Sequence, residues 1–380
     1  MLFRSVWKEA ERITGLANPN SVVQLKEWLA ENGHETETLA KAAVAELIEE
    51  TESLRVQRVL ELRQEMARTS VKKYEAMDRA RCRDDRIRGL LQFYGANRTG
   101  RFAGRLVQVQ NLPRNNMLDL NLARQTLRSG DYETLGLLWD SVPDVLSQLI
   151  RTALVPMPGH VFIASDFSAI EARVIAWLAG EQWRLDVFHG HGKIYEASAA
   201  QMFGVPVEEI DRGSTLRQKG KVAELALGYQ GGPGALKVMG ALEMGLGEEE
   251  LPGLVKTWRA ANPAICQFWR DVGDAAMTAV RDRARVRLQH GLKFSYESGM
   301  LRVRLPSGRH LHYVRPRIEI DPRFGREGLT YEGYEAGRWG RLRTFGGKLS
   351  ENITQAVARD CLTEALWRLK DRRIVFHVHD

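Results

Sequence analysis

The chain has 380 residues, 44% of them hydrophobic and 27% charged, which is the composition of a globular protein long enough for two or three lobes with separate cores. Its net charge of +7 and pI near 9.3 favour a polyanionic partner. No apolar run approaches the length of a membrane span, and no secretory leader is recognisable. Three scattered cysteines without a CxxC pair argue against a disulfide framework or zinc ribbon. We therefore expect a cytoplasmic protein with no membrane partner.

The N-terminal part of the chain, 1–90, predicts a mostly helical lobe. Leu25 and Trp28 recur at helical spacing, and Ser21 stands where it can cap that helix. The stretch 55–88 is long, charged and helical in pattern. Most such stretches form a solvated helical hairpin, and the functional alternative is a lobe that lies along a nucleic-acid duplex.

A basic stretch leads out of this lobe. Residues 72–105 contain ten lysines and arginines against four acidic residues. The stretch includes Thr99-Gly-Arg101 and is followed by Gln110-Asn-Leu-Pro-Arg114. Glycine lets a backbone approach phosphates closely, and arginine neutralises their charge. The stretch therefore predicts contact with a nucleic-acid backbone.

A strand followed by a helix is predicted at 161–181. Residues 161–164 have strand character, and the apolar residues from Ile170 onward recur with the 3.6-residue period of an amphipathic helix. Asp166 should therefore lie where the strand ends and the helix begins, and a carboxylate on a rigid strand end can bind a metal ion. For this residue alone, the alternative is an aspartate that caps an ordinary strand–helix unit.

A second helix with an ordered series of side chains is predicted further along. Arg217, Lys221, Leu225 and Tyr229 follow one another at four-residue spacing and form one slowly drifting stripe on an α-helix. Two cations, an apolar residue and an aromatic residue fit a nucleoside triphosphate laid along the helix, because cations meet phosphates and the apolar end meets sugar and base. The alternative is an amphipathic helix with a basic end.

The next stretch predicts helices and then a hairpin. Residues 241–285 have a helical pattern, with Trp258 and Phe268 as expected core residues. Residues 301–314 alternate apolar and basic side chains around a turn at 306–308, which predicts a β-hairpin. The basic face of this hairpin either lies against nucleic-acid phosphates or is ordinary solvated surface.

The last stretch predicts a helix and a final strand. The helix is expected over 345–369, beginning near Ser350. The strand is expected at 374–378 and leads directly to His379 and Asp380.

Four of these strings resemble motifs of DNA polymerase family A. Residues 165–173, SDFSAIEAR, resemble the family pattern D-[YF]-S-x-I-E-x-R. Residues 217–230 are similar to R-x-x-x-K-x-x-x-F/Y-x-x-x-Y-G, residues 99–113 to T-G-R…N-L-Q-N-I-P, and the closing Val-His-Asp to V-H-D-E. The sequence therefore looks like a phage-type polymerase of that family.

For the reaction, the resemblance implies template-directed transfer of deoxynucleotides to a primer 3′-hydroxyl, with two Mg²⁺ ions as cofactors. Asp166 and Asp380 would be the two metal-binding aspartates, together with the backbone carbonyl of Phe167. Lys221 would be the catalytic cation that offsets the charge of the leaving pyrophosphate and donates a proton to it.

For the substrates, the resemblance implies that the incoming dNTP binds to Arg217, Lys221, Leu225 and Tyr229, and that Glu171 closes off the sugar 2′ position. Leu225 stands where the family pattern has an aromatic residue, which predicts altered discrimination against dideoxynucleotides. The residues expected to contact template–primer DNA are Thr99, Arg101, Gln110, Asn111, Arg114, Gln355 and His379.

The resemblance also implies an α/β (α+β) fold shaped like a right hand. The expected helical thumb is 1–90, the palm is assembled from 91–180 and 286–380 around an antiparallel sheet, and the helical fingers are 181–285. The sequence would then be a fragment, without the upstream exonuclease domain and without the C-terminal end of the palm. Such an enzyme replicates DNA in the cytoplasm of a bacterium or phage-infected host, with a processivity factor or other replisome proteins as further partners.

Two other functions stay open from the sequence. A single-subunit RNA polymerase shares the two aspartates and a similar helix, but Glu171 stands where an enzyme that makes RNA needs a small residue. A non-catalytic DNA-binding remnant of a polymerase would fit a chain that stops at Asp380. The choice between ribonucleotides and deoxyribonucleotides separates the first from a DNA polymerase, and primer extension separates the second.

Overall fold

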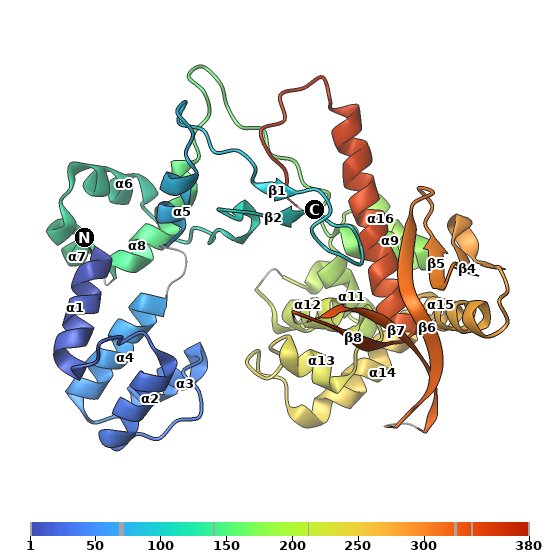
Figure 1. Ribbon diagram of the computed structural model, residues 1–380, viewed down its shortest axis with the longest axis horizontal. Coiled ribbons are helices and arrows are strands. Elements are labelled where there is room, and N and C mark those ends of the chain that lie inside the picture. The colour runs from blue at the N-terminus through green and yellow to red at the C-terminus, as the bar shows by residue number, and fades with distance from the viewer. Residues whose placement is uncertain are drawn as a thin grey trace. The chain divides into compact units, whose positions relative to one another are not determined.

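The computed structural model describes residues 2–67, 72–139, 141–211, 213–322, 325–335 and 337–378. Two of the expected site residues, His379 and Asp380, therefore lie outside the described residues. The chain divides into two compact units, the first made of residues 1–90 and 104–163 and the second of residues 91–103 and 164–380. Figure 1 labels most of the helices and strands of both units.

The first unit is built of helices. They are α1 (Leu2–Thr14), α2 (Val22–Glu31), α3 (Lys41–Glu50), α4 (Leu54–Ala67), α5 (Lys72–Ala80), α6 (Leu120–Ser129), α7 (Tyr132–Leu138) and α8 (Val142–Leu149), with short 3₁₀ helices η1 (Val109–Asn111) and η2 (Ile150–Ala153). In the described residues, the predicted helical pattern of the N-terminal lobe is confirmed as far as Ala80. Beyond Ala80 the chain forms a turn, in which Arg81 pairs with Ile87 and Asp85 takes a left-handed conformation (φ 58°).

The core of the N-terminal helices contains the residues expected from helical spacing. Leu25 and Trp28 of α2 are buried together with Leu60 of α4. The hydroxyl oxygen of Ser21 accepts a hydrogen bond from the backbone N–H of Gln24 at 3.4 Å, so the predicted helix cap is confirmed.

The second unit combines helices with a six-stranded sheet. Its helices are α9 (Ile170–Ala179), α10 (Gln182–His189), α11 (Ile194–Phe203), α12 (Thr215–Leu227), α13 (Pro233–Val238), α14 (Leu251–Ala261), α15 (Pro263–Arg281) and α16 (Gly346–Arg368), with 3₁₀ helices η3 (Val207–Glu209), η4 (Glu248–Glu250) and η5 (Gln289–Gly291). The sheet consists of β3 (Val286–Arg287), β4 (Lys293–Glu297), β5 (Met300–Arg304), β6 (His310–Asp321), β7 (Arg326–Glu335) and β8 (Arg338–Thr344). The short strands β1 (Leu91–Gln92) and β2 (Ala103–Gly104) form a separate two-stranded sheet.

Each strand of the large sheet pairs antiparallel with the next one along the chain. In the hairpin of β5 and β6, Leu301 pairs with Tyr313 and Val303 with Leu311, and all four side chains are buried. The residues between them point to the opposite face, as the pleat requires. The predicted hairpin at 301–314 and the predicted antiparallel sheet are therefore confirmed.

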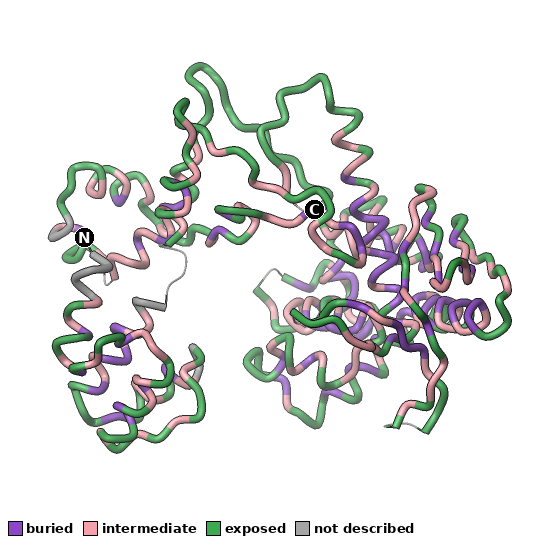
Figure 2. Tube along the Cα trace, viewed as in Figure 1, coloured by how far each residue is buried: buried purple, intermediate pink, exposed green. Residues whose placement is uncertain are grey.

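Helix α9 lies between two hydrophobic cores. On one side, Val174 and Leu178 join a core formed by the sheet, α15 and α16. On the other side, Ile175 joins a core formed by α11, α12, α13, α14 and α15. Figure 2 colours the buried residues of these elements purple. The predicted helix is confirmed, and because α9 is packed on both sides, the side chains at its N-terminus stand on a rigid element.

The prediction of a strand at 161–164 is wrong. These residues form no strand, and Val161 and Ile163 are 80% and 92% exposed. The strand predicted at 374–378 is also absent. A strand exists where a second strand exchanges backbone hydrogen bonds with it, and neither segment has such a partner among the described residues. Asp166 therefore follows an exposed segment and not the end of a strand.

Helix α16 begins at Gly346 and not near Ser350, where the sequence predicts its start. Glycine is a poor helix former, but close packing requires it here. A Cβ atom on Gly346 would lie 1.9 Å from the carbonyl oxygen of Trp269, and one on Gly347 would lie 2.5 Å from that of Tyr229. Intrinsic helix propensity does not report such contacts, so the earlier start is a tertiary effect.

A similar close approach between α11 and α12 provides a matched pair of substitutions. A Cβ atom on Gly220 would lie 2.3 Å from the carbonyl oxygen of Tyr195, whereas nothing lies within 4 Å of one on Gly253 in α14. We expect Gly220→Ala to lower the free energy of unfolding by about 3 kcal/mol through overpacking. Gly253→Ala should raise it by roughly 0.5–1 kcal/mol, because alanine is the better helix former. Urea unfolding measures both, and equal effects of the two substitutions would contradict the close helix crossing.

Candidate functional site

The turn that carries Asp166 has an uncommon backbone. Ser168 and Ala169 both adopt left-handed conformations, with φ of 54° and 55°, and Ala169 immediately precedes α9. The backbone N–H of Ser168 donates a hydrogen bond to Oδ1 of Asp166 at 3.1 Å. Left-handed residues that carry a side chain are strained, and such strain concentrates at functional sites.

Glu171, in the first turn of α9, joins two segments that are far apart in the sequence. Its Oε1 accepts a hydrogen bond from Nη1 of Arg101 at 2.7 Å, and its Oε2 accepts one from the hydroxyl of Tyr229 at 3.0 Å. Burial, and then the negative charge of Glu171, raise the pKa of Tyr229 well above its usual value, so the phenol stays protonated and can keep donating. Three sequence motifs therefore meet at one carboxylate.

A cavity of about 310 Å³ opens beside this carboxylate. Its wall includes Asp166, Glu171, Tyr195, Leu225 and Tyr229, all from the second unit. Leu225 is 51% exposed, so a bound molecule can reach it. A wall with acidic groups on one part and apolar and aromatic groups on another suits a ligand with both polar and apolar parts.

The stripe predicted on α12 lies on a helix as far as Leu225, and Tyr229 lies two residues beyond the last helical residue, Leu227. Arg217 donates from Nε to Oε1 of Glu196 at 2.7 Å. Burial opposes the ionisation of Glu196 and is the largest single effect, yet the hydrogen bond and charge of Arg217, a backbone hydrogen bond and the charge of Lys193 together lower the pKa of that carboxyl. Lys221 is half-buried and forms no ion pair with a described carboxylate. Of the two cations in the stripe, Arg217 is therefore already paired with a carboxylate, and Lys221 has no carboxylate partner within the described part of the chain.

A buried ion pair forms part of the cavity wall, and sequence reasoning missed it. Arg184 of α10 donates to both carboxylate oxygens of Glu224 of α12, and the two side chains are 2% and 4% exposed. Oε1 of Glu224 also accepts hydrogen bonds from the hydroxyl of Ser198 at 2.8 Å and from Nε1 of Trp258 at 3.0 Å. The guanidinium in turn donates to Asn262 at 2.8 Å. One carboxylate therefore links α10, α11, α12 and α14.

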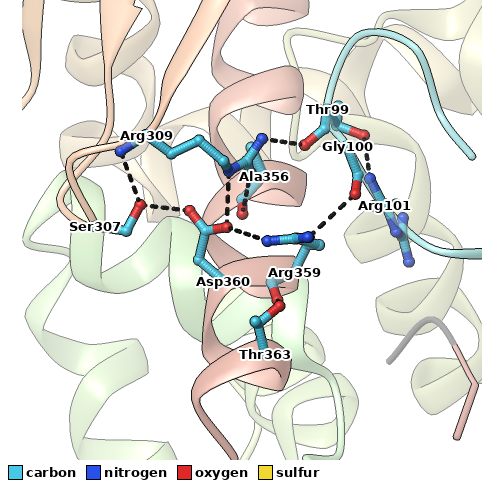
Figure 3. Close-up of polar contacts among 9 residues, drawn as sticks. All are labelled: Thr99, Gly100, Arg101, Ser307, Arg309, Ala356, Arg359, Asp360 and Thr363. Atoms are coloured by element: carbon cyan, nitrogen blue, oxygen red, sulfur yellow. Dashed lines mark hydrogen bonds and ion pairs between the residues drawn. The ribbon is translucent and has the colours of Figure 1, made fainter. Parts of the chain in front are cut away.

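Two arginines hold the backbone of the Thr-Gly-Arg motif. Arg309 donates from Nη1 to the carbonyl oxygen of Thr99 at 2.9 Å, and Arg359 donates from Nε to that of Gly100 at 3.1 Å. Both arginines also donate to Asp360, and Figure 3 shows this network next to α16. The motif is therefore fixed by its backbone, while the side chain of its arginine is left to reach Glu171.

The residues expected to contact DNA near this motif lie in two different units. Thr99 is 3% exposed, and its hydroxyl accepts a hydrogen bond from the backbone N–H of Arg101 at 3.4 Å. Gln110, Asn111 and Arg114 belong to the first unit, with Asn111 and Arg114 exposed. The structure thus brings Arg101 to Glu171, in the second unit, and places the Gln-Asn-Leu-Pro-Arg string in the first unit.

Two further candidates for DNA contact lie on α16 and on the hairpin. Gln355 of α16 is half-buried and donates to Oε1 of Glu351 at 3.4 Å. On the basic face of the hairpin, Arg302 donates to Glu297 at 2.7 Å. Part of that basic face is therefore neutralised within the sheet.

Asp166 has the properties of a metal ligand. Its carboxylate is exposed and forms no ion pair with a described cation, so it can offer oxygen atoms to a hard cation. The next residue, Phe167, whose backbone carbonyl is expected to be a further ligand, is 38% exposed. No three His, Cys, Asp or Glu side chains gather as ligands within the described ranges, and Asp380 lies outside them.

The cysteines Cys82, Cys266 and Cys361 are free. Of the helices in the described residues, none has the length and apolar character needed to cross a membrane.

Three of the motifs that resemble those of DNA polymerase family A therefore meet at Glu171, a residue of the cavity wall. The model of DNA polymerase family A matches residues 3–281, and the chain belongs to this family. The family assignment made from the sequence motifs is therefore confirmed.

Among individual relatives, a DNA polymerase of Bacillus phage SP02 is 65% identical over 375 residues, which cover 98% of this chain and 58% of that protein. DNA polymerase I of Rhizobium leguminosarum is 29% identical over 148 residues, covering 39% of this chain and 14% of that protein. Thermostable DNA polymerase I of Thermus thermophilus is 42% identical over 66 residues, which cover 17% of this chain and 8% of that protein. The chain thus spans less than two thirds of the length of these relatives.

A solved structure shares the fold. The POL domain of Pol1 from M. smegmatis, in complex with DNA primer-template and dNTP, has a TM-score of 0.60 with this chain at 19% identity. The match covers 100% of this chain and 56% of that one. The expected polymerase fold class is therefore confirmed.

Proposed function

We propose that the protein to which this chain belongs is a template-directed DNA polymerase that adds deoxynucleotides to a primer 3′-hydroxyl in DNA replication. The observation that supports this most is the position of Glu171, which lies on the cavity wall and accepts hydrogen bonds from Arg101 and Tyr229. Membership of DNA polymerase family A and the 65% identical phage DNA polymerase support the same function. The proposal concerns the whole protein, since the chain spans 58% of that relative.

In this proposal the incoming dNTP lies along α12. Arg217 and Lys221 face the phosphates, and Leu225 and Tyr229 face the sugar and base. Arg217 then shares its guanidinium between Glu196 and a phosphate, because its Nε is already engaged. Glu171 closes the space beside the sugar 2′ carbon, and its two hydrogen bonds keep it there.

We place two Mg²⁺ ions with Asp166, Asp380 and the backbone carbonyl of Phe167, because carboxylate and carbonyl oxygens are the ligands that Mg²⁺ prefers and the carboxylate of Asp166 is exposed. When bound, such ions activate the primer 3′-hydroxyl and stabilise charge on the phosphates. Lys221 offsets the charge that develops on the leaving pyrophosphate and supplies its proton.

The remaining assignments extend this proposal to the rest of the chain. The thumb is 1–90, the palm is 91–180 with 286–380, and the fingers are 181–285. Template–primer DNA is contacted by the segments that carry Thr99, Arg101, Gln110, Asn111, Arg114, Gln355 and His379. The protein works in the cytoplasm of a bacterium or phage-infected host, with a processivity factor or other replisome proteins as partners.

The choice of nucleotide tests the proposed function. With primed template and Mg²⁺, the whole protein should extend the primer with dNTPs and use rNTPs about a hundredfold less efficiently. In Glu171→Ala the space at the 2′ position opens, and the ratio of rNTP to dNTP use should rise by about tenfold or more. A parent protein that prefers rNTPs would instead be an RNA polymerase, and one that binds the duplex without extending it would be a DNA-binding remnant.

Leu225→Tyr is expected to increase dideoxynucleotide incorporation by about tenfold. Leu225 is 51% exposed on the cavity wall, and a tyrosine hydroxyl there provides a polar group where the substrate lacks its 3′-hydroxyl. Competition between ddNTP and dNTP in primer extension measures the change. Leu225→Phe is the matched control, with the ring but without the hydroxyl. If Leu225→Tyr incorporates dideoxynucleotides no more readily than the parent, this role of Leu225 is wrong.

A further inference from the structure

We propose that Arg173 is a positioning residue, which clamps the turn after Asp166 and so determines how this carboxylate is presented to a metal ion. The catalytic consequence rests on the proposed function, whereas the clamp itself is a property of the fold. The inference rests on two independent contacts of the guanidinium and on the backbone conformation of the turn.

The first contact is with the turn. The side-chain Nε of Arg173 donates a hydrogen bond to the carbonyl oxygen of Ser168 at 2.8 Å. The backbone N–H of Arg173 donates to the carbonyl oxygen of Ala169 at 3.1 Å. These are the two residues with left-handed conformations. The N–H of Ser168 in turn donates to Oδ1 of Asp166 at 3.1 Å. A continuous series of hydrogen bonds therefore runs from the guanidinium through the turn to the carboxylate.

The second contact fixes the direction of the guanidinium. Its Cζ lies 4.4 Å from the centre of the Phe188 ring on α10, which is the distance of a cation–π interaction. A planar guanidinium can lie over a ring and still donate from Nε in its own plane. The ammonium group of lysine is a compact charge without this geometry, so Arg173→Lys is not a conservative change here.

The turn needs such a clamp. L-residues with a Cβ atom disfavour the left-handed region, so two of them in succession relax unless other contacts hold them. The segment before them is exposed and has no strand partner among the described residues. A catalytic side chain has to be held to within about 0.5 Å, and Asp166 is two residues from the strained pair, so relaxation of the turn would displace its carboxylate.

Amide hydrogen exchange on the whole protein, without metal or substrate, tests the clamp directly. In Arg173→Ala the amides of Ser168 and Arg173 should exchange at least about tenfold faster, while buried amides of α15 keep their rates. Phe188→Leu, which removes the ring under the guanidinium, should accelerate the same two amides to a smaller extent. Unchanged exchange at these amides in Arg173→Ala would overturn the clamp.

Primer extension tests the consequence. Arg173→Ala should lower kcat about tenfold and raise the Mg²⁺ concentration for half-maximal rate severalfold, with the KM for dNTP within about twofold of the parent. Adding Ser168→Gly and Ala169→Gly should recover part of the loss, because glycine adopts left-handed conformations without strain. A higher KM for dNTP at unchanged Mg²⁺ dependence would overturn the proposal and make Arg173 a phosphate ligand. A parent protein that extends no primer would contradict the proposed function and leave the exchange test of the clamp standing.

Discussion

Asp166→Ala in the whole protein is expected to reduce primer extension by a factor of about a hundred to a thousand or more. The exposed carboxylate of Asp166 stands on the cavity wall and has no cationic partner among the described residues, so its removal takes away the proposed metal ligand without breaking an ion pair. Affinity for primed DNA should stay within about threefold, because phosphate contacts by cations supply most of that affinity. Single-nucleotide extension at saturating substrate and fluorescence anisotropy with labelled duplex measure the two quantities.

Two controls separate loss of a ligand from damage to the turn. Asp166→Asn keeps an oxygen that can accept the hydrogen bond from Ser168 but lacks the charge, and it should be as inactive as the alanine variant. Asp282→Ala removes an exposed carboxylate beyond α15 in the same unit and should leave extension unchanged. Extension by Asp166→Ala at the parental rate would remove this residue from the reaction.

Glu224→Ala is expected to lower the free energy of unfolding by about 3–5 kcal/mol, the typical cost of leaving a buried partner charge uncompensated. The substitution leaves the guanidinium of Arg184 without its carboxylate and removes the acceptor for Ser198 and Trp258. Four helices around the cavity lose a common contact. Urea unfolding monitored by tryptophan fluorescence measures the loss.

A double-mutant cycle separates the ion pair from the other hydrogen bonds. Glu224→Gln can still accept hydrogen bonds from Ser198 and Trp258 but loses the charge, and Arg184→Met removes the cation while keeping a long side chain. We expect the double variant to be more stable than the sum of the two single losses implies, since neither buried charge is then left alone. Additive losses would show that Arg184 and Glu224 are not coupled.

Local patterns were sufficient for the helices of the site. The apolar period after Ile170 predicted α9, and the four-residue spacing from Arg217 to Leu225 predicted that part of α12, because amphipathic helices carry their burial pattern in the sequence. The hairpin of β5 and β6 was predictable for the same reason, with alternation in place of the helical period.

Contacts between distant residues were not predictable in this way. The bonds that Arg309 and Arg359 make to the backbone of Thr99 and Gly100 join positions more than two hundred residues apart and leave no periodic signal. The prediction of a strand at 161–164 was wrong because strand character shows that a segment can pair with another strand, and does not show that a partner strand is present. The hydrogen bonds of Glu171 with Arg101 and Tyr229 depend on the fold, which brings together three segments that are far apart in the sequence.

Anomalous diffraction from crystals of the whole protein with primed DNA, a non-reactive dNTP analogue and Mn²⁺ tests the nucleotide site most directly. We predict a Mn²⁺ peak about 2.2 Å from a carboxylate oxygen of Asp166, the triphosphate along α12 beside Lys221, and the sugar against Glu171. A metal and triphosphate bound elsewhere, with Asp166 free of both, would contradict the assignment of this cavity as the site of nucleotide addition.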